Sequence, residues 1–179
     1  MKLPLVIVSI LIGCLLMSAT AYARGTYQTP QAFISQAFNA EVPKAKVFWV
    51  DEPAKKVIES ILSHRFKKMR LRYWQQINES IWIMDEIGKE SPITVGIHVK
   101  DRAIAQTKVL VYRESRGDEV RHDFFTDQFK SAKLQSDLTL DTHIDGITGA
   151  TLSVRALTKL ARIALYLDDY VINNRENKN

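Results

Sequence analysis

This chain of 179 residues contains one cysteine, Cys14. A single cysteine excludes an intrachain disulfide, a thiolate zinc cluster and a thioredoxin-like CxxC pair. The four histidines, His64, His98, His122 and His143, lack metal-ligand spacing, so we expect no metal site. Glycine (7) and proline (5) are also few, and no repeat or low-complexity tract interrupts the chain, which favours one folded domain.

Charge of one sign is not dominant either. Lys and Arg total 25 and Asp and Glu total 20, so the net charge is +5. This excess is too small and too scattered to indicate a protein that binds nucleic acid. One basic segment, residues 64–74, interleaves cations with aromatic side chains. We interpret it as a solvated face or as a docking patch for an acidic redox partner.

The N-terminus carries the one long apolar run. Lys2 precedes an uncharged stretch over residues 3–17, which is followed by the small-residue site Ala21-Tyr22-Ala23. This order predicts a secretory signal peptide over residues 1–23, cleaved before Arg24. The run could instead remain as a membrane anchor, or Leu11 to Cys14 could be a lipoprotein box. In each case the domain is periplasmic or otherwise exported, and in the last two it is held at the membrane.

We treat residues 24–172 as one domain and residues 173–179 as a polar tail. Sequence signals for helices occur near both ends of this domain. Thr29 followed by Pro30 predicts the N-cap and first residue of one helix, and Asp51 with Pro53 opens a second. A third helix is predicted from about 153 to 172, with apolar residues at spacings of three and four and Arg155, Lys159 and Arg162 on its solvent side.

Between these helices the apolar period becomes alternating. Four strands are predicted, at residues 69–75, 80–86, 93–99 and 103–112. Short polar joints at 76–79 and 100–102 favour hairpins and a half-buried antiparallel sheet. A short helix or turn is expected around Phe124, Phe125 and Phe129. The fold class is therefore α+β: an antiparallel sheet of about four to six strands flanked by helices, with a long C-terminal helix.

The segment at residues 145–153, immediately before the last helix, is rich in small and hydroxyl-bearing residues. Backbone N–H groups and the positive end of the helix dipole suit such a place to a phosphate. The alternative is an ordinary helix start, with Thr151 or Ser153 as the N-cap. From the residues alone we favour the ordinary helix start, because most hydroxyl-rich helix starts bind nothing.

The run Thr148, Gly149, Ala150, Thr151, preceded by Asp145, resembles the S/T-G-A-T flavinylation motif of the FMN-binding domain family. That family includes the flavin-bearing C subunit of sodium-pumping NADH:quinone oxidoreductase and the G subunit of the Rnf complex. The resemblance implies that Thr151 carries FMN through a phosphoester, which a magnesium-requiring flavin transferase installs from FAD. The other cofactor-binding residues expected in this segment are Asp145, Thr148, Gly149, Ala150 and Ser153.

A second stretch, residues 109–117, resembles the family's strand followed by an E-S/T-P-G turn, and Gln128 lies in a segment like the family's F-x-x-Q-F. Arg116 replaces the usual proline and the second glycine of the turn is missing. We expect Glu114 and Ser115 near the isoalloxazine ring or the ribityl chain; a solvated loop charge is the alternative for Glu114. The resemblance covers about residues 80–172.

The resemblance implies an exported electron-transfer flavoprotein that passes electrons between a membrane or periplasmic donor and an acceptor. Its partners would be the flavin transferase and a redox protein, with no nucleic acid. No residue resembles a substrate-handling general base, so we expect a carrier rather than a self-contained enzyme. Two alternatives remain: a flavin-dependent reductase of a small acceptor, and a module that binds FMN or another phosphate without a covalent bond. Aromatic side chains that could pack beside a flavin, or simply fill the core, are Trp74, Trp82 and Tyr112.

Overall fold

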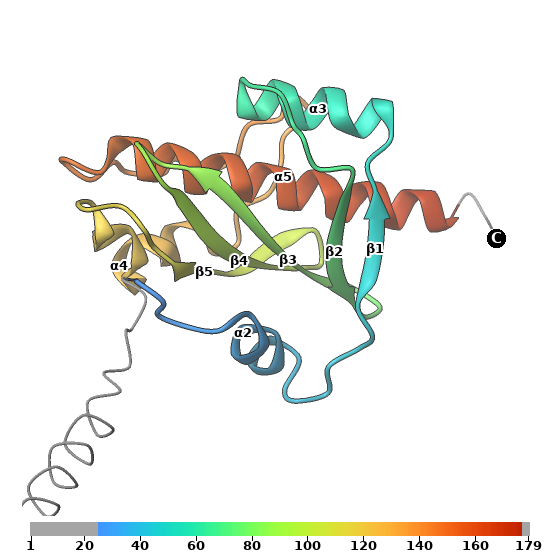
Figure 1. Ribbon diagram of the computed structural model, residues 1–179. Helices are drawn as coiled ribbons and strands as arrows, with labels where there is room; N and C mark the ends of the chain where they lie inside the picture. Colours follow the sequence, from blue (N-terminus) through green and yellow to red (C-terminus); the bar gives the residue numbers. More distant parts are fainter. Residues whose placement is uncertain (1–24, 177–179) are drawn as a thin grey trace, which may run out of the picture.

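The structure is a computed structural model that describes residues 25–176 (Figure 1). The predicted signal peptide, with Cys14 and the candidate lipoprotein box, lies outside the described residues, and so does the end of the predicted tail, 177–179. Across residues 25–176 we find no helix with the length and apolar character that crossing a bilayer requires. In the same range no three His, Cys, Asp or Glu side chains are placed to hold a metal ion.

The sheet has five strands in sequence order, each antiparallel to the next. Its strands are β1 (Lys46–Trp49), β2 (Arg70–Gln75), β3 (Glu79–Ile87), β4 (Pro92–Lys100) and β5 (Ala103–Val111). The four predicted strands are confirmed, with ends that differ by one residue, whereas β1 was missed. Four residues are too few for an alternating pattern to stand out from the surrounding sequence.

Helices α2 (Pro30–Ala37) and α3 (Glu52–Leu62) begin where the sequence predicts. The Thr29 Oγ1 accepts the Ala32 N–H at 3.1 Å, and the Asp51 Oδ1 accepts the Ala54 N–H at 3.0 Å, so both expected N-caps are confirmed. The short helix expected around Phe125 is α4 (Asp123–Thr126), flanked by the 3-10 turns η1 (Asp118–Arg121) and η2 (Asp127–Phe129).

The last helix, α5 (Thr151–Glu176), is longer than predicted at both ends. It begins at Thr151 rather than at 153, and it continues through residues 173–176, which we had assigned to a polar tail. The early start matters for the site, because it places Thr151 in the first turn of the helix instead of in the preceding loop.

Helices cover both faces of the sheet. Helices α3 and α5 pack on one face and α2 on the other (Figure 1). On β4 the predicted apolar face is fully buried, at Ile93, Val95, Ile97 and Val99. The other face is buried as well, because α2 lies over it: a Cβ on Gly96 would stand 2.7 Å from the Phe33 ring. The expectation of a half-buried sheet is therefore wrong for β4, which the sequence could not show without knowing where α2 packs.

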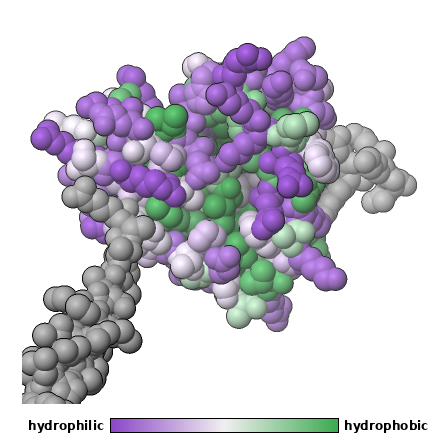
Figure 2. All heavy atoms as spheres, viewed as in Figure 1, coloured by the Kyte–Doolittle hydropathy of each residue, from purple (hydrophilic) through white to green (hydrophobic). Residues whose placement is uncertain are grey.

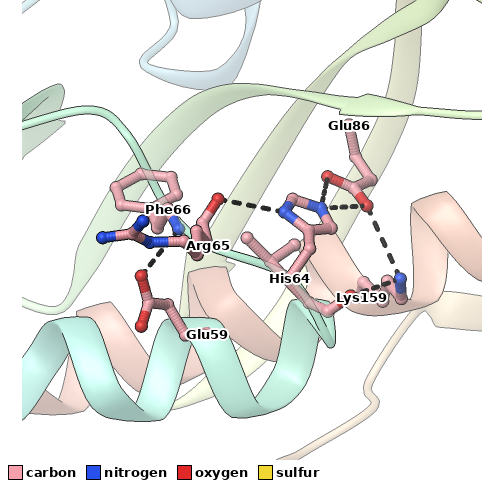
Figure 3. Close-up of polar contacts among 7 residues, drawn as sticks. Glu59, His64, Arg65, Phe66, Glu86 and Lys159 are labelled. Carbon is pink, nitrogen blue, oxygen red and sulfur yellow. Dashed lines mark hydrogen bonds and ion pairs between the residues drawn. The ribbon is translucent and has the colours of Figure 1, made fainter.

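The polar side of α5 is packed in part: Arg155 is exposed, whereas Lys159 is half-buried. The Lys159 ammonium donates to the Leu62 carbonyl oxygen at 2.6 Å and lies 3.5 Å from a carboxylate oxygen of Glu86, which is buried (Figure 3). The His64 Nε2 lies 3.0 Å from the same carboxylate, which raises the pKa of the imidazole. This cluster connects the end of α3 to β3 and α5, so His64 has a structural partner in Glu86.

Candidate functional site

Two segments that are far apart in the sequence meet at the start of α5. The turn over residues 114–117 follows β5 and packs directly on Ala150, so that a Cβ on Gly117 would stand 3.0 Å from the Ala150 Cβ. Gly117 also has a φ of 84°, a conformation that favours glycine. The glycine therefore permits both the turn and its close approach to the helix start.

Tyr112 joins the same two segments by hydrogen bonds. Its hydroxyl donates to the Arg116 carbonyl oxygen at 2.6 Å and is also 2.9 Å from the Ser153 Oγ. Burial raises the pKa of the phenol, although the Ser153 hydrogen bond acts against this, so the hydroxyl stays protonated and able to donate. Tyr112 and Ser153 are thus engaged in fixing the geometry of the site.

A cavity of about 290 Å³ opens where these segments meet the turn between β3 and β4. Lys89 of that turn lines it, together with Arg116. Six of the eight site residues expected from the sequence also line it: Glu114, Ser115, Gly149, Ala150, Thr151 and Ser153. A second hollow, of about 380 Å³, shares Glu114 and Ser115 with the first. Together the two hollows reach the size of pockets that hold cofactors.

The charges around Thr151 favour an anion. Thr151 is the first residue of α5 and is exposed, and the first N–H groups of a helix have no partner within the helix. Lys89 and Arg116 add two cations to the cavity wall, although Lys89 also lies 3.2 Å from a carboxylate oxygen of Glu90. A phosphate linked to the Thr151 hydroxyl would therefore meet both the helix dipole and side-chain cations.

Glu114 holds the turn that carries Lys89. Its Oε1 accepts the backbone N–H groups of Lys89, Glu90 and Ser91 at 2.5, 2.7 and 3.0 Å. Burial alone would raise the pKa of this carboxyl, but the three hydrogen bonds, led by that of Ser91, bring the pKa below its ordinary value. Glu114 is therefore a bonded part of the cavity wall and not a merely solvated loop charge, while its contact with a flavin remains a prediction.

Asp145 and Thr148 are exposed and do not line the cavity. The Asp145 N–H donates to the Gln128 Oε1 at 2.7 Å, so the segment that resembles F-x-x-Q-F fixes the loop ahead of α5. The predicted roles of Asp145 and Thr148 toward the cofactor therefore stay predictions. The alternative that Thr151 or Ser153 is an ordinary N-cap is wrong, because both lie within the helix.

None of the three aromatic side chains considered as flavin neighbours lines the 290 Å³ cavity, although Tyr112 lines the 380 Å³ hollow beside it. Trp82 is fully buried and stacks on Tyr73 with ring centroids 4.6 Å apart. Trp74 lies on the α2 side of the sheet, and Tyr112 is the buried anchor described above. Trp82 and Tyr112 thus belong to the core.

Three residues of the cavity wall were missed as site residues: Lys89, Arg116 and Leu152. Arg116 had been noted only as a departure from the family's turn, yet its positive charge was a usable signal. Lys89 carried no signal in the sequence, because only the folding of the β3–β4 turn over Glu114 brings it to the cavity.

In a comparison with known families, residues 88–166 match the model of the FMN-binding domain. The matched segment begins at Gly88, in the turn that Glu114 holds, and includes the whole wall of the cavity around Thr151. It leaves out α2, β1, α3, β2 and β3. No curated protein matched the sequence.

Proposed function

Because residues 88–166 match the model of the FMN-binding domain, we propose that this chain is an exported electron-transfer flavoprotein with FMN attached through a phosphoester to Thr151. The observation that supports attachment at this position is the Thr151 hydroxyl, which lies on the first turn of α5 in a cavity that also presents Lys89 and Arg116. The predicted signal peptide supports export. Retention of the cofactor outside the cytoplasm gives the covalent bond a purpose.

For the attachment reaction we propose the course that the resemblance implies at Thr151. Its Oγ1 attacks the phosphorus on the FMN side of FAD, the bond to the AMP phosphate breaks, and AMP leaves while the hydroxyl proton passes to a base of the flavin transferase. The product at Thr151 is an anionic phosphodiester. Lys89, Arg116 and the first N–H groups of α5 offset its charge.

When bound, FMN supplies transfer of one or two electrons. The protein binds and orients the cofactor: Glu114 holds one wall, and Tyr112 with Ser153 holds the other. These three polar residues are engaged in hydrogen bonds within the fold, which favours a carrier over a self-contained oxidoreductase. The partners we propose are a flavin transferase for maturation and a redox protein in the periplasm or at the membrane.

The test is coexpression of the full chain with a flavin transferase, followed by a denaturing gel viewed for flavin fluorescence. We expect a fluorescent band from the parent, no band from Thr151→Ala, and a band from Thr151→Ser, which keeps a hydroxyl. A band that persists in Thr151→Ala contradicts the assignment of the attachment site. Flavin that copurifies but is released on denaturation would support the alternative of a non-covalent binding module.

Carrier and reductase are separated by a turnover assay with the flavinylated protein. A carrier reduced by dithionite should hold its electrons until a partner protein is added. Rapid, repeated reduction of a small quinone or metal chelate by a soluble donor, with no partner present, would instead support the reductase.

A further inference from the structure

A groove of about 770 Å³ lies between α2 and strands β1 and β2, away from the cavity at Thr151. Its apolar lining includes Ile34, Val42, Val47, Trp74 and Ile83. Figure 2 shows apolar side chains gathered in the middle and lower part of this face, bordered by hydrophilic ones. All five of these residues precede residue 88, so the groove is built outside the matched FMN-binding segment.

The groove exists because α2 covers only part of its side of the sheet. Its apolar residues pack with Ile81 and Leu110, and Trp74 of β2 borders this cluster, but no residue of β1 belongs to it. On the uncovered part the Val47 side chain is 47% exposed and the Trp49 side chain is 64% exposed. An apolar surface of this kind beside a concave lining is typical of an interaction site.

Two arginines give the groove a positive charge. Arg70 and Arg72 alternate with buried residues along β2, so both lie on the open face. Within residues 25–176 neither guanidinium forms an ion pair. The Arg70 guanidinium lies 6.0 Å from the centre of the Trp49 ring. The rim therefore has cations that no carboxylate of the described fold neutralises.

We infer that this groove docks an acidic segment of a partner protein, in which carboxylates are interspersed with apolar side chains. Carboxylates of such a segment would pair with Arg70 and Arg72, and its apolar side chains would pack against Trp74 and Ile83. The concave shape favours a chain segment over a flat lipid surface, because the apolar residues line a hollow rather than a protruding edge.

Strand β3 links the groove to the cofactor cavity. Ile83 lines the groove, and Lys89, six positions later (83 to 89), lines the cavity. A strand rises about 3.3 Å per residue, so the two residues are at most about 20 Å apart. A partner docked in the groove would thus stand near the proposed flavin. The docking itself does not require the flavin, because none of the groove's residues lines the cavity.

The test is fluorescence anisotropy of dye-labelled peptides in which aspartate or glutamate alternates with leucine, valine or phenylalanine. Saturable binding to the full chain is expected. Arg72→Glu and Val42→Asp should each weaken it about tenfold or more, since one removes the charge pair and the other the apolar contact. Both side chains are exposed, so neither change threatens the core. The matched control is Lys56→Glu, at an exposed position of α3. It makes the same change in net charge as Arg72→Glu but lies outside the groove, so the peptide affinity should stay within about twofold of the parent's.

The same titration with Thr151→Ala separates this inference from the proposed function, since peptide binding should survive the loss of covalent flavin. Absence of binding up to about 1 mM peptide overturns the inference, and so does equal weakening by Lys56→Glu and Arg72→Glu. Anionic vesicles, or the aromatic sulfonate dye anilinonaphthalene sulfonate, are run in parallel. The inference is also overturned if no peptide binds but the vesicles or the dye bind in a way that depends on Arg72 and Val42. That result would assign the groove to another occupant.

Discussion

The buried carboxyl of Asp168 should make this fold less stable as the pH rises. Asp168 lies in α5 and is only 1% exposed. Its Oδ1 accepts a hydrogen bond from the Ser80 hydroxyl at 2.5 Å. The Ser80 Oγ in turn accepts a hydrogen bond from the Trp82 Nε1 at 2.9 Å. Among residues 25–176 the Asp168 Oδ2 finds no hydrogen-bond partner. Burial raises the pKa of Asp168 to about 6, with a smaller contribution from Asp169 and an opposing one from Ser80.

The sign follows from the two states. The unfolded carboxyl ionises near 3.8 and the folded one near 6, so the folded state binds the proton more tightly. The contribution of Asp168 to the free energy of unfolding therefore falls as the pH rises from about 4 to about 6 and stays at the lower value above that. The difference between these pKa values corresponds to about 3 kcal/mol.

Asp168→Asn removes this ionisation while keeping the shape of the side chain. At pH 8 we expect a gain of about 1–3 kcal/mol in the free energy of unfolding. The gain can be smaller than the roughly 3 kcal/mol derived from the pKa difference, because the asparagine N–H₂ group would occupy the site of the Oδ2, where the described fold offers it no hydrogen-bond partner. At pH 4 the gain should vanish. Urea unfolding at pH 4, 6 and 8 measures both.

The control for this experiment is Asp137→Asn, on the surface. There the Thr139 side chain holds the pKa of the carboxyl below its ordinary value, so this variant should not be more stable than the parent at pH 8. A gain for Asp168→Asn that is the same at pH 4 and pH 8, or a loss at pH 8, would refute the reasoning. An equal gain in Asp137→Asn would show a general effect of net charge instead.

Two further predictions concern the site and the sheet. Glu114→Ala leaves three backbone N–H groups of the β3–β4 turn without their acceptor. It should therefore lower the free energy of unfolding by about 2 kcal/mol and reduce the flavin fluorescence of the band on the denaturing gel. Glu114→Gln keeps one carbonyl oxygen, so its stability and flavin incorporation should lie between those of the parent and of Glu114→Ala. Gly96→Ala places a methyl group 2.7 Å from the Phe33 ring and should cost about 1–3 kcal/mol in urea unfolding. Gly146→Ala, with no atom within 4 Å, is its control and should be near neutral. Equal stability of the two glycine variants, or full flavin incorporation in Glu114→Ala, would contradict these expectations.

Local signals in the sequence were sufficient for most of the elements. The helix starts at Thr29 and Asp51 were predictable because an N-cap is a contact between residues three positions apart. The buried face of β4 was predictable because alternation specifies one side of a strand. In both cases the interaction that fixes the element involves neighbours in the sequence.

Features that depend on distant contacts were not predictable in this way. The second buried face of β4 depends on α2, and the partly packed polar side of α5 depends on the end of α3, which receives the Lys159 hydrogen bond. Lys89 reaches the cavity only through Glu114, 25 residues later. The groove beside α2 likewise requires β1, which was too short to recognise.

The roles of the two hydroxyl groups at the start of α5 were ambiguous in the sequence and are less so in the structure. Two hydroxyls, those of Thr151 and Ser153, were equivalent candidates for an N-cap. The structure separates them: the Ser153 Oγ is buried against the Tyr112 hydroxyl, while Thr151 is exposed on the cavity wall and its hydroxyl makes no hydrogen bond within residues 25–176. An ester at Ser153 would break the Tyr112 contact, whereas one at Thr151 would not, so the fold supports the position that the resemblance implies.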